Sequence, residues 1–147
     1  MKEEKPWSAV YKEIYVLMEK KRNQMFRESG ITSAQMGVLI TLDLSREPFL
    51  TMKELEKRMC LAQSTVVGLV ARLEQKGFVE CGIDEKDRRI KWVMRSEAGI
   101  QLCQHTREEL QRLDREMLKG LSEEEREEFI RLLDRLKVSL EEEELQN

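Results

Sequence analysis

The segment that decides the fold runs from Thr51 to Arg95 and reads TMKELEKRMCLAQSTVVGLVARLEQKGFVECGIDEKDRRIKWVMR. In its middle, apolar side chains recur at the spacing of one helical face: Val66, Leu69, Val70 and Leu73. This spacing predicts a helix over about Ala62–Lys76 whose apolar face is buried. The opposite face carries small or hydrogen-bonding side chains, whereas a surface helix without a partner usually carries Glu and Lys there.

A charged hairpin follows this helix. Gly77 is a helix stop, and the residues after it suit a strand: Phe78, Val79 and Cys81–Ile83. After the charged turn Asp84–Arg89, apolar residues alternate along a return strand at Ile90, Trp92 and Met94. Two helices and a hairpin with arginines near its tip form a winged helix-turn-helix. We therefore predict a mainly α fold with a small β-hairpin wing (α+β), the alternative being a small α+β core with a merely solvated loop.

Further helices flank this segment on both sides. Apolar stripes predict helices over Trp7 to about Glu28, Ser33 to about Ser45, and Ser96 to about Lys119, with a last helix carrying Phe129, Leu132, Leu133, Leu136 and Leu140. Three capping boxes mark helix starts: Thr32 with Gln35, Thr51 with Glu54, and Ser122 with Glu125. The stripes of the terminal helices exceed what the central segment can cover. We therefore expect a homodimer, which would bury them.

Charge is distributed unevenly along the 147 residues, whose net charge is −3. Residues 46–96 carry 11 Lys and Arg against 8 Asp and Glu, whereas residues 97–147 carry 8 against 15. The local excess of positive charge in residues 46–96 matters for phosphate attraction, because salt screens charges over about 8 Å. There is no apolar run of the roughly 20 residues that a membrane span needs. The N-terminus lacks a secretion signal, so we expect a cytoplasmic protein that does not bind membranes.

Several stretches resemble the MarR family of transcriptional regulators. They are ITSAQMGVLITL (31–42), LTMKELEKRM (50–59), STVVGLVARLEQKGFVE (64–80), the D-x-x-D-R-R turn (84–89) and SEAG (96–99). The resemblance implies one domain over 1–147, with a winged-helix DNA-binding lobe at 32–96 and dimerisation helices at 7–29 and 97–144. It also implies a homodimeric repressor on a palindromic double-stranded DNA operator, which a small aromatic or phenolic anion releases.

Ten residues of the helix and the wing are candidate DNA contacts: Gln63, Ser64, Thr65, Val67, Gly68, Arg72, Lys86, Asp87, Arg88 and Arg89. A helix in the major groove needs a slim face whose groups reach base edges, and Val67 can touch a thymine methyl. In the family the wing arginine at the place of Arg88 enters the minor groove, and Asp87 orients an arginine. The alternatives are local capping for residues 63–65, a structural pair between Arg72 and Asp84 or Asp87, and a solvated turn for the wing.

Three residues depart from the family's common pattern. Ala62 stands where many relatives carry a capping Ser or Asp, so the helix start is expected to be weakly capped. Gly68 stands where a basic or polar residue is common, which makes the usual base preference doubtful. Cys81 replaces a frequent Arg and removes a phosphate contact or an ion pair.

Enzymatic and metal-binding functions are not expected. His105 is the single histidine and has no nucleophile or carboxylate at triad-like placing, so we expect a surface or interface residue. Cys60, Cys81 and Cys103 are too scattered for a metal site, and we expect no cofactor. We expect Cys60 and Cys103 to be buried structural residues. The functional alternatives are a thiol-based redox regulator of the same fold and a helical protein-interaction module that binds no DNA.

Overall fold

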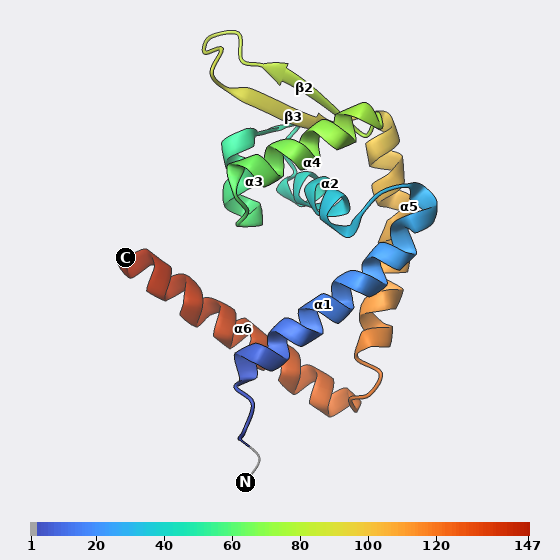
Figure 1. Cartoon of the computed structure of the whole chain (residues 1–147), viewed down its shortest axis with the longest axis vertical. Helices are drawn as coiled ribbons and strands as arrows, with labels where there is room; N and C mark the ends of the chain where they lie inside the picture. The colour runs from blue at the N-terminus through green and yellow to red at the C-terminus, as the bar shows by residue number, and fades with distance from the viewer. Residues whose placement is uncertain (1–2) are drawn as a thin grey trace. The chain divides into compact units, whose positions relative to one another are not determined.

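The computed structural model describes residues 3–147, which form two compact units that divide after Leu110 (Figure 1). The first unit contains α1 (Trp7–Phe26), a 3-10 turn (Arg27–Ser29), α2 (Ser33–Ser45), β1 (Leu50–Thr51), α3 (Met52–Met59), α4 (Gln63–Gln75), β2 (Val79–Ile83) and β3 (Lys91–Arg95). The helix α5 (Glu97–Met117) runs from the first unit into the second, which also contains α6 (Glu123–Gln146). The predicted mainly helical fold with a small wing is confirmed.

The helix starts follow from local sequence. At α2 the hydroxyl of Thr32 accepts from the backbone amide of Gln35 at 3.2 Å, and the Gln35 side chain accepts from the amide of Thr32 at 3.3 Å. The reciprocal bonds of a capping box also form at the starts of α3 and α6. All three predicted boxes are confirmed. Such caps stabilise a helix by typically about 1 kcal/mol.

The strands form an antiparallel sheet with β3 in the centre, in the order β1-β3-β2. The short β1 was not predicted, because two residues carry no periodicity. It pairs Leu50 with Val93, and β2 pairs Cys81 with the same residue. Val93 is buried, whereas its neighbours Trp92 and Met94 are half-buried. The inward face of β3 is therefore the one that carries Val93, although the apolar alternation in the sequence runs through Trp92.

The core of the first unit lies between α2, α3, α4 and the sheet. Its buried apolar side chains are Phe26, Ile31, Met36, Val38, Leu39, Leu42, Leu50, Leu55, Val66, Val70, Leu73, Val79, Val93 and Cys103. Three of the four apolar residues predicted to face inward from α4 are in this set, and Leu69 packs against it. The predicted orientation of α4 is therefore confirmed.

The first and last helices present apolar side chains to solvent. In α1 the one buried residue is Phe26, and the exposed ones include Val10, Tyr11, Ile14 and Leu17. In α6, whose residues are all described, none is buried, and Leu133 and Leu136 are 43% and 37% exposed. Within residues 3–147, no helix is both long and apolar enough to cross a membrane.

Candidate nucleic-acid interface

The helix α4 begins without a side-chain cap. Ala62 occupies the N-cap position in an extended conformation, and no side chain caps the first turn, which confirms the expectation drawn from Ala62. The connection from α3 is short, because Cys60 adopts a left-handed conformation with φ of 53° and turns the chain. The first amides of a helix carry a partial positive charge and attract anions. The start of α4 therefore offers donors to a phosphate or a base edge.

The outer face of α4 is slim and open to solvent. Each of the predicted contact residues on it is exposed: Gln63, Ser64, Thr65, Val67, Gly68 and Arg72. A Cβ atom added at Gly68 would meet nothing within 4 Å, so open space lies above that position. Gln75, which the sequence analysis did not select, is exposed as well and follows Gly68 and Ala71 at helical spacing. At Gly68 and Ala71 only small residues lie on this face, so a partner can approach the helix closely there.

Arg72 does not pair with the wing, and this corrects one alternative of the sequence analysis. Within the described residues its guanidinium has no ion pair with Asp84 or Asp87. Asp84 instead accepts the backbone amides of Lys86 and Asp87, at 2.8 and 3.0 Å. Asp84 and Asp87 are thus bonded within the wing tip, and the Arg72 side chain remains available to an external partner.

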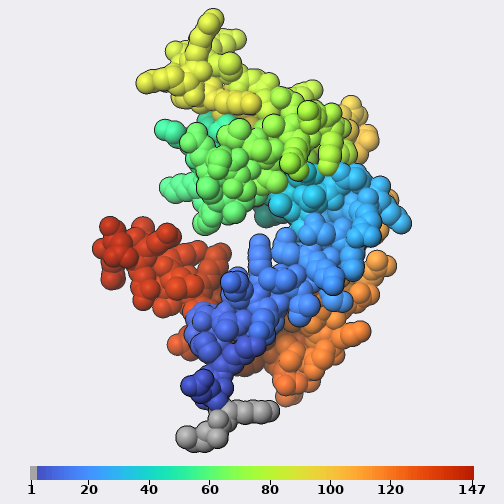
Figure 2. Space-filling model, viewed as in Figure 1, coloured from blue at the N-terminus to red at the C-terminus, as the bar shows by residue number. Residues whose placement is uncertain are grey.

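The wing tip is internally ordered and projects beyond α3 and α4 (Figures 1 and 2). Arg89 donates to Asp87 from two nitrogens of its guanidinium, at 3.0 and 2.9 Å, and this pairing holds the pKa of the Asp87 carboxyl below its usual value. A carboxylate with a lowered pKa keeps its pair at neutral pH and loses it only under acid conditions. Arg88 and Lys86 are exposed, and neither has an ion pair in the part of the chain that the structure describes.

Comparison with known proteins shows which proteins resemble this chain in sequence and fold. Residues 29–90, which hold α2 to α4 and most of the wing, match the MarR family model. A crystal structure of a MepR–DNA complex from Staphylococcus aureus superposes with a TM-score of 0.82 at 26% identity, over 92% of this chain and 99% of that one. Over residues 29–90 the chain is similar to the MarR family. That family consists of transcription regulators and not of enzymes.

Two other known proteins are similar to this chain. An uncharacterized transcriptional regulator of the helix-turn-helix type, YwhA of Bacillus subtilis strain 168, is 31% identical over 86 residues, which are 58% of this chain and 62% of that protein. The match thus spans about three fifths of that relative. A mutant of MarR from Escherichia coli, crystallised with operator DNA, has a TM-score of 0.80 at 23% identity, over 89% of this chain and 93% of that one. At that identity the likeness shows the fold alone.

One charged cluster near the base of the wing was missed by the sequence analysis. Asp43, near the end of α2, forms an ion pair with Arg95 at 3.0 Å through one carboxylate oxygen and accepts a hydrogen bond from Arg107 at 2.9 Å with the other. Arg95 follows Val93 on the inward face of β3, and Arg107 lies on α5. The sequence held two signals of this cluster: an arginine at an inward position of a strand, and an aspartate in the apolar helix α2. Neither signal identifies the residue with which it pairs.

The cysteines lie in three different environments. Cys103 is buried as predicted, but Cys60 is exposed, so the prediction that it is buried was wrong. The reason is its left-handed position after α3, where it leaves the helical period that buries Leu55. Burial and a hydrogen bond with Glu74 raise the pKa of the Cys81 thiol to about 11, and burial raises the pKa of Cys103. Both thiols therefore stay protonated at neutral pH, which opposes reactivity.

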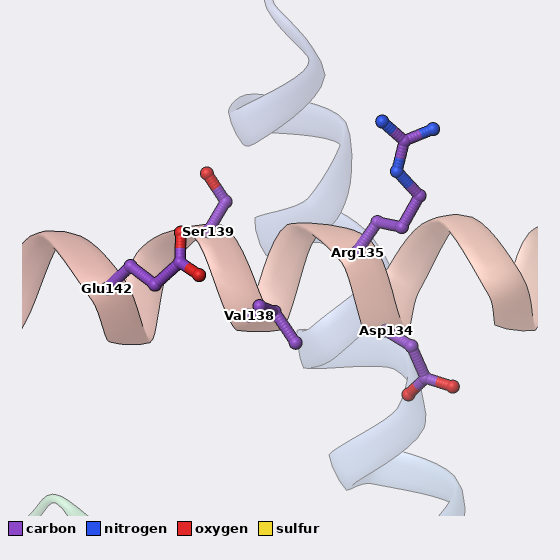
Figure 3. Close-up of a pocket in the computed structure, with 5 residues that line it drawn as sticks. All are labelled: Asp134, Arg135, Val138, Ser139 and Glu142. Carbon is purple, nitrogen blue, oxygen red and sulfur yellow. The ribbon is translucent and has the colours of Figure 1, made fainter.

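The surface of α6 does not supply a ligand site. Figure 3 shows a shallow depression lined by Asp134, Arg135, Val138, Ser139 and Glu142. All five residues come from one helix, and their charged ends point in different directions (Figure 3). A second depression lies around Phe129 and Leu132. Binding sites for small molecules are concave and bury most of the ligand, which one helix cannot do.

Proposed function

We propose that this chain is a cytoplasmic transcriptional repressor that binds a palindromic double-stranded DNA operator as a homodimer. The observation that carries the proposal is the joint exposure of two elements in the first unit. One is the slim, uncapped face of α4, and the other is an ordered wing tip with Arg88 outside any ion pair among the described residues. The match of residues 29–90 to the MarR family model and the likeness to a MepR–DNA complex support it.

The outer face of α4 suits the DNA major groove. That groove is about 12 Å wide and presents a different donor and acceptor pattern for each base pair. Gln63 carries an amide that can bond to a base edge, and Ser64 and Thr65 add hydroxyl groups in the same first turn. Val67 is 46% exposed and offers a methyl surface to thymine. In this arrangement the contacts of α4 with base edges determine which DNA sequence is bound.

The wing suits the minor groove beside it. Arg89 forms an ion pair with Asp87, whereas Arg88 at the same tip is exposed. Arginine is favoured in narrow minor grooves, where the negative potential is enhanced. Because A·T and T·A look alike there, the wing adds affinity with little sequence information. Lys86 lies on the same turn and adds positive charge near the phosphates.

A second copy of the chain accounts for the apolar residues of α1 and α6. Monomeric proteins rarely expose large contiguous apolar patches, and those that exist usually mark an interface. Two copies related by a two-fold axis also place two α4 helices about one helical turn of DNA apart, as a palindromic operator requires. The dimerisation segments 7–29 and 97–144 are thus part of the proposal.

A small aromatic or phenolic anion is the proposed effector that releases the DNA. This extension rests on the similarity to the MarR family, since the depressions on α6 do not form its site. The check uses benzoate as the probe against the preformed DNA complex. Failure of benzoate and of a phenol to release the duplex at millimolar concentration contradicts the proposed effector class.

Two substitutions separate the roles of the helix and the wing. We expect Gln63→Ala to cost about 1–3 kcal/mol on the preferred duplex and to relax the choice at one base pair in each half-site. We expect Arg88→Ala to weaken binding to nearly all sequences and to reduce the salt dependence by about one phosphate equivalent or less. The measurement is selection from a random duplex pool with the native chain and both variants, at two salt concentrations.

The outcomes of this selection discriminate among the candidate functions. An unchanged base preference for Gln63→Ala means that another residue of α4 contacts the base. Native affinity in Arg88→Ala means that the wing does not contact DNA. If the native chain selects no sequence and binds no duplex above background, the interaction-module alternative replaces the DNA-binding proposal.

The thiols are proposed to be structural, and a cysteine-free variant tests this. We expect the triple variant Cys60→Ser, Cys81→Ala, Cys103→Ala to bind DNA as the native chain does, with or without peroxide, because the raised pKa values of Cys81 and Cys103 keep both thiols protonated. Binding is measured by fluorescence anisotropy. Loss of native binding in peroxide, with the variant spared, would establish the redox alternative instead.

A further inference from the structure

The wing tip is a rigid unit that needs an external support to point in one direction. The bonds of Asp84 to two backbone amides and of Asp87 to Arg89 fix the tip within itself. Between Ile83 and Ile90, however, no residue is buried. The direction of the tip is therefore set at the base of the hairpin, where β2 and β3 meet the helices.

At that base, one carboxylate joins three elements. Asp43 of α2 forms ion pairs with Arg95, the last residue of β3, at 3.0 Å, and with Arg107 of α5 at 2.9 Å. The two bonds differ in environment, because the side chain of Arg95 is 19% exposed and that of Arg107 is 59% exposed. Exposed pairs contribute little, whereas removal of one partner from a partly buried pair leaves a charge that has lost its solvation. The Asp43–Arg95 bond is the stronger support.

Within residues 3–147, Asp43 is the one acidic side chain that forms an ion pair with Arg95. Arg95 pairs across the sheet with Val79, and its guanidinium also lies beside the buried thiol of Cys103, which stays protonated. Loss of the Asp43 charge would leave the guanidinium without a counter-ion on the inward face of β3. The end of β3 would then turn toward water and carry the hairpin with it.

The helix α4 is held in place by other contacts than those that hold the wing. That helix is held through Val66, Val70 and Leu73 in the apolar core, and Lys76 at its end bonds to the Gly30 carbonyl and to Gln35. Loss of the Asp43 charge therefore affects the wing and leaves the helix in place. We propose that Asp43 is the positioning residue of the wing, holding Arg88 where the DNA contact needs it. This role rests on the proposed function.

A double-mutant cycle on DNA is the first test. We expect Asp43→Asn to weaken binding and to make Arg88→Ala at least about threefold less costly than in the native chain, because residues that act through one element are coupled. Gln63→Ala should cost the same in both backgrounds. Arg95→Gln should reproduce Asp43→Asn, and Arg107→Gln is the matched control, since it removes only the exposed bond of the same carboxylate.

Hydrogen exchange of the DNA-free chain, followed by mass spectrometry, is the second test. We expect faster amide exchange over 79–83 and 91–95 in Asp43→Asn and Arg95→Gln, with the peptides of α4 unchanged. If exchange rises equally in α4, or in neither element, the positioning role is overturned. An equal cost of Arg88→Ala in both backgrounds also overturns it, while the DNA function stands. If no variant or native chain binds a duplex but the strands still loosen, the proposed DNA function fails and Asp43 remains the support of the wing.

Discussion

Leu133→Asp or Leu136→Asp is expected to turn the proposed dimer into a monomer and to abolish tight operator binding. Both leucines lie on α6, where no residue is buried within the single chain, and both are nevertheless less exposed than Leu145 at 88%. Burial of a leucine side chain contributes about 1.5–3 kcal/mol, and two-fold symmetry places each change in the interface twice. A rise of about 100-fold or more in the dimer dissociation constant follows.

DNA binding should fall together with dimerisation in these variants. Two linked half-sites bind far more tightly than one, because the second contact forms within the complex. The measurement is light scattering at micromolar concentration together with DNA titration, and Leu145→Asp on the same helix is the control that should remain a dimer. A native chain that scatters light as a pure monomer would refute the dimer, and so would a Leu133→Asp variant that keeps its mass and affinity.

Gly99→Ala is expected to have the largest effect on folding stability. Gly99 is buried in the first turn of α5, and a Cβ atom there would lie 2.1 Å from the carbonyl oxygen of Phe78 and 3.5 Å from Leu39. That oxygen belongs to the backbone and accepts from the amide of Ser96 at 3.1 Å, so it cannot move without breaking the junction between the wing and α5. We expect a loss of about 2–3 kcal/mol in the free energy of unfolding, in the range of overpacked core substitutions.

Urea denaturation at one fixed protein concentration measures this effect, because the proposed dimerisation would make apparent stability depend on concentration. Gly68→Ala is the matched control. A Cβ at Gly68 meets nothing within 4 Å, and alanine inside a helix is favoured over glycine by about 0.5–1 kcal/mol. The control should therefore be stabilised. Equal unfolding free energies for Gly99→Ala and the native chain would show that α5 does not approach the Phe78 carbonyl so closely.

Features that depend on local sequence were predictable from the chain alone. The capping boxes need only residues three positions apart, and the buried face of α4 needs only its period. The missing cap at Ala62 was predicted for the same reason. The exposure of the predicted contact residues on α4 followed from the buried face, since the opposite side of an amphipathic helix faces solvent.

Features that depend on segments far apart in the sequence were not predictable. The strand β1 exists because Leu50 reaches Val93, and its two residues have no pattern of their own. The bonds of Asp43 join it to residues on β3 and α5 that lie far along the chain, and only the folded backbone brings them together. Cys60 was placed in the core by its residue type, whereas the left-handed turn after α3 determines its exposure.

A titration of the native chain against duplex DNA tests the central claim most directly. The two duplexes are the sequence that the chain selects from a random pool and a scrambled duplex of the same composition, each measured by anisotropy at several salt concentrations. We predict two chains per selected duplex, an affinity at least about 1,000-fold above that for the scrambled one, and a linear fall of log affinity with log salt. Equal affinity for the two duplexes, or no binding to either, would contradict the account of α4 and the wing as a sequence-specific DNA-binding surface.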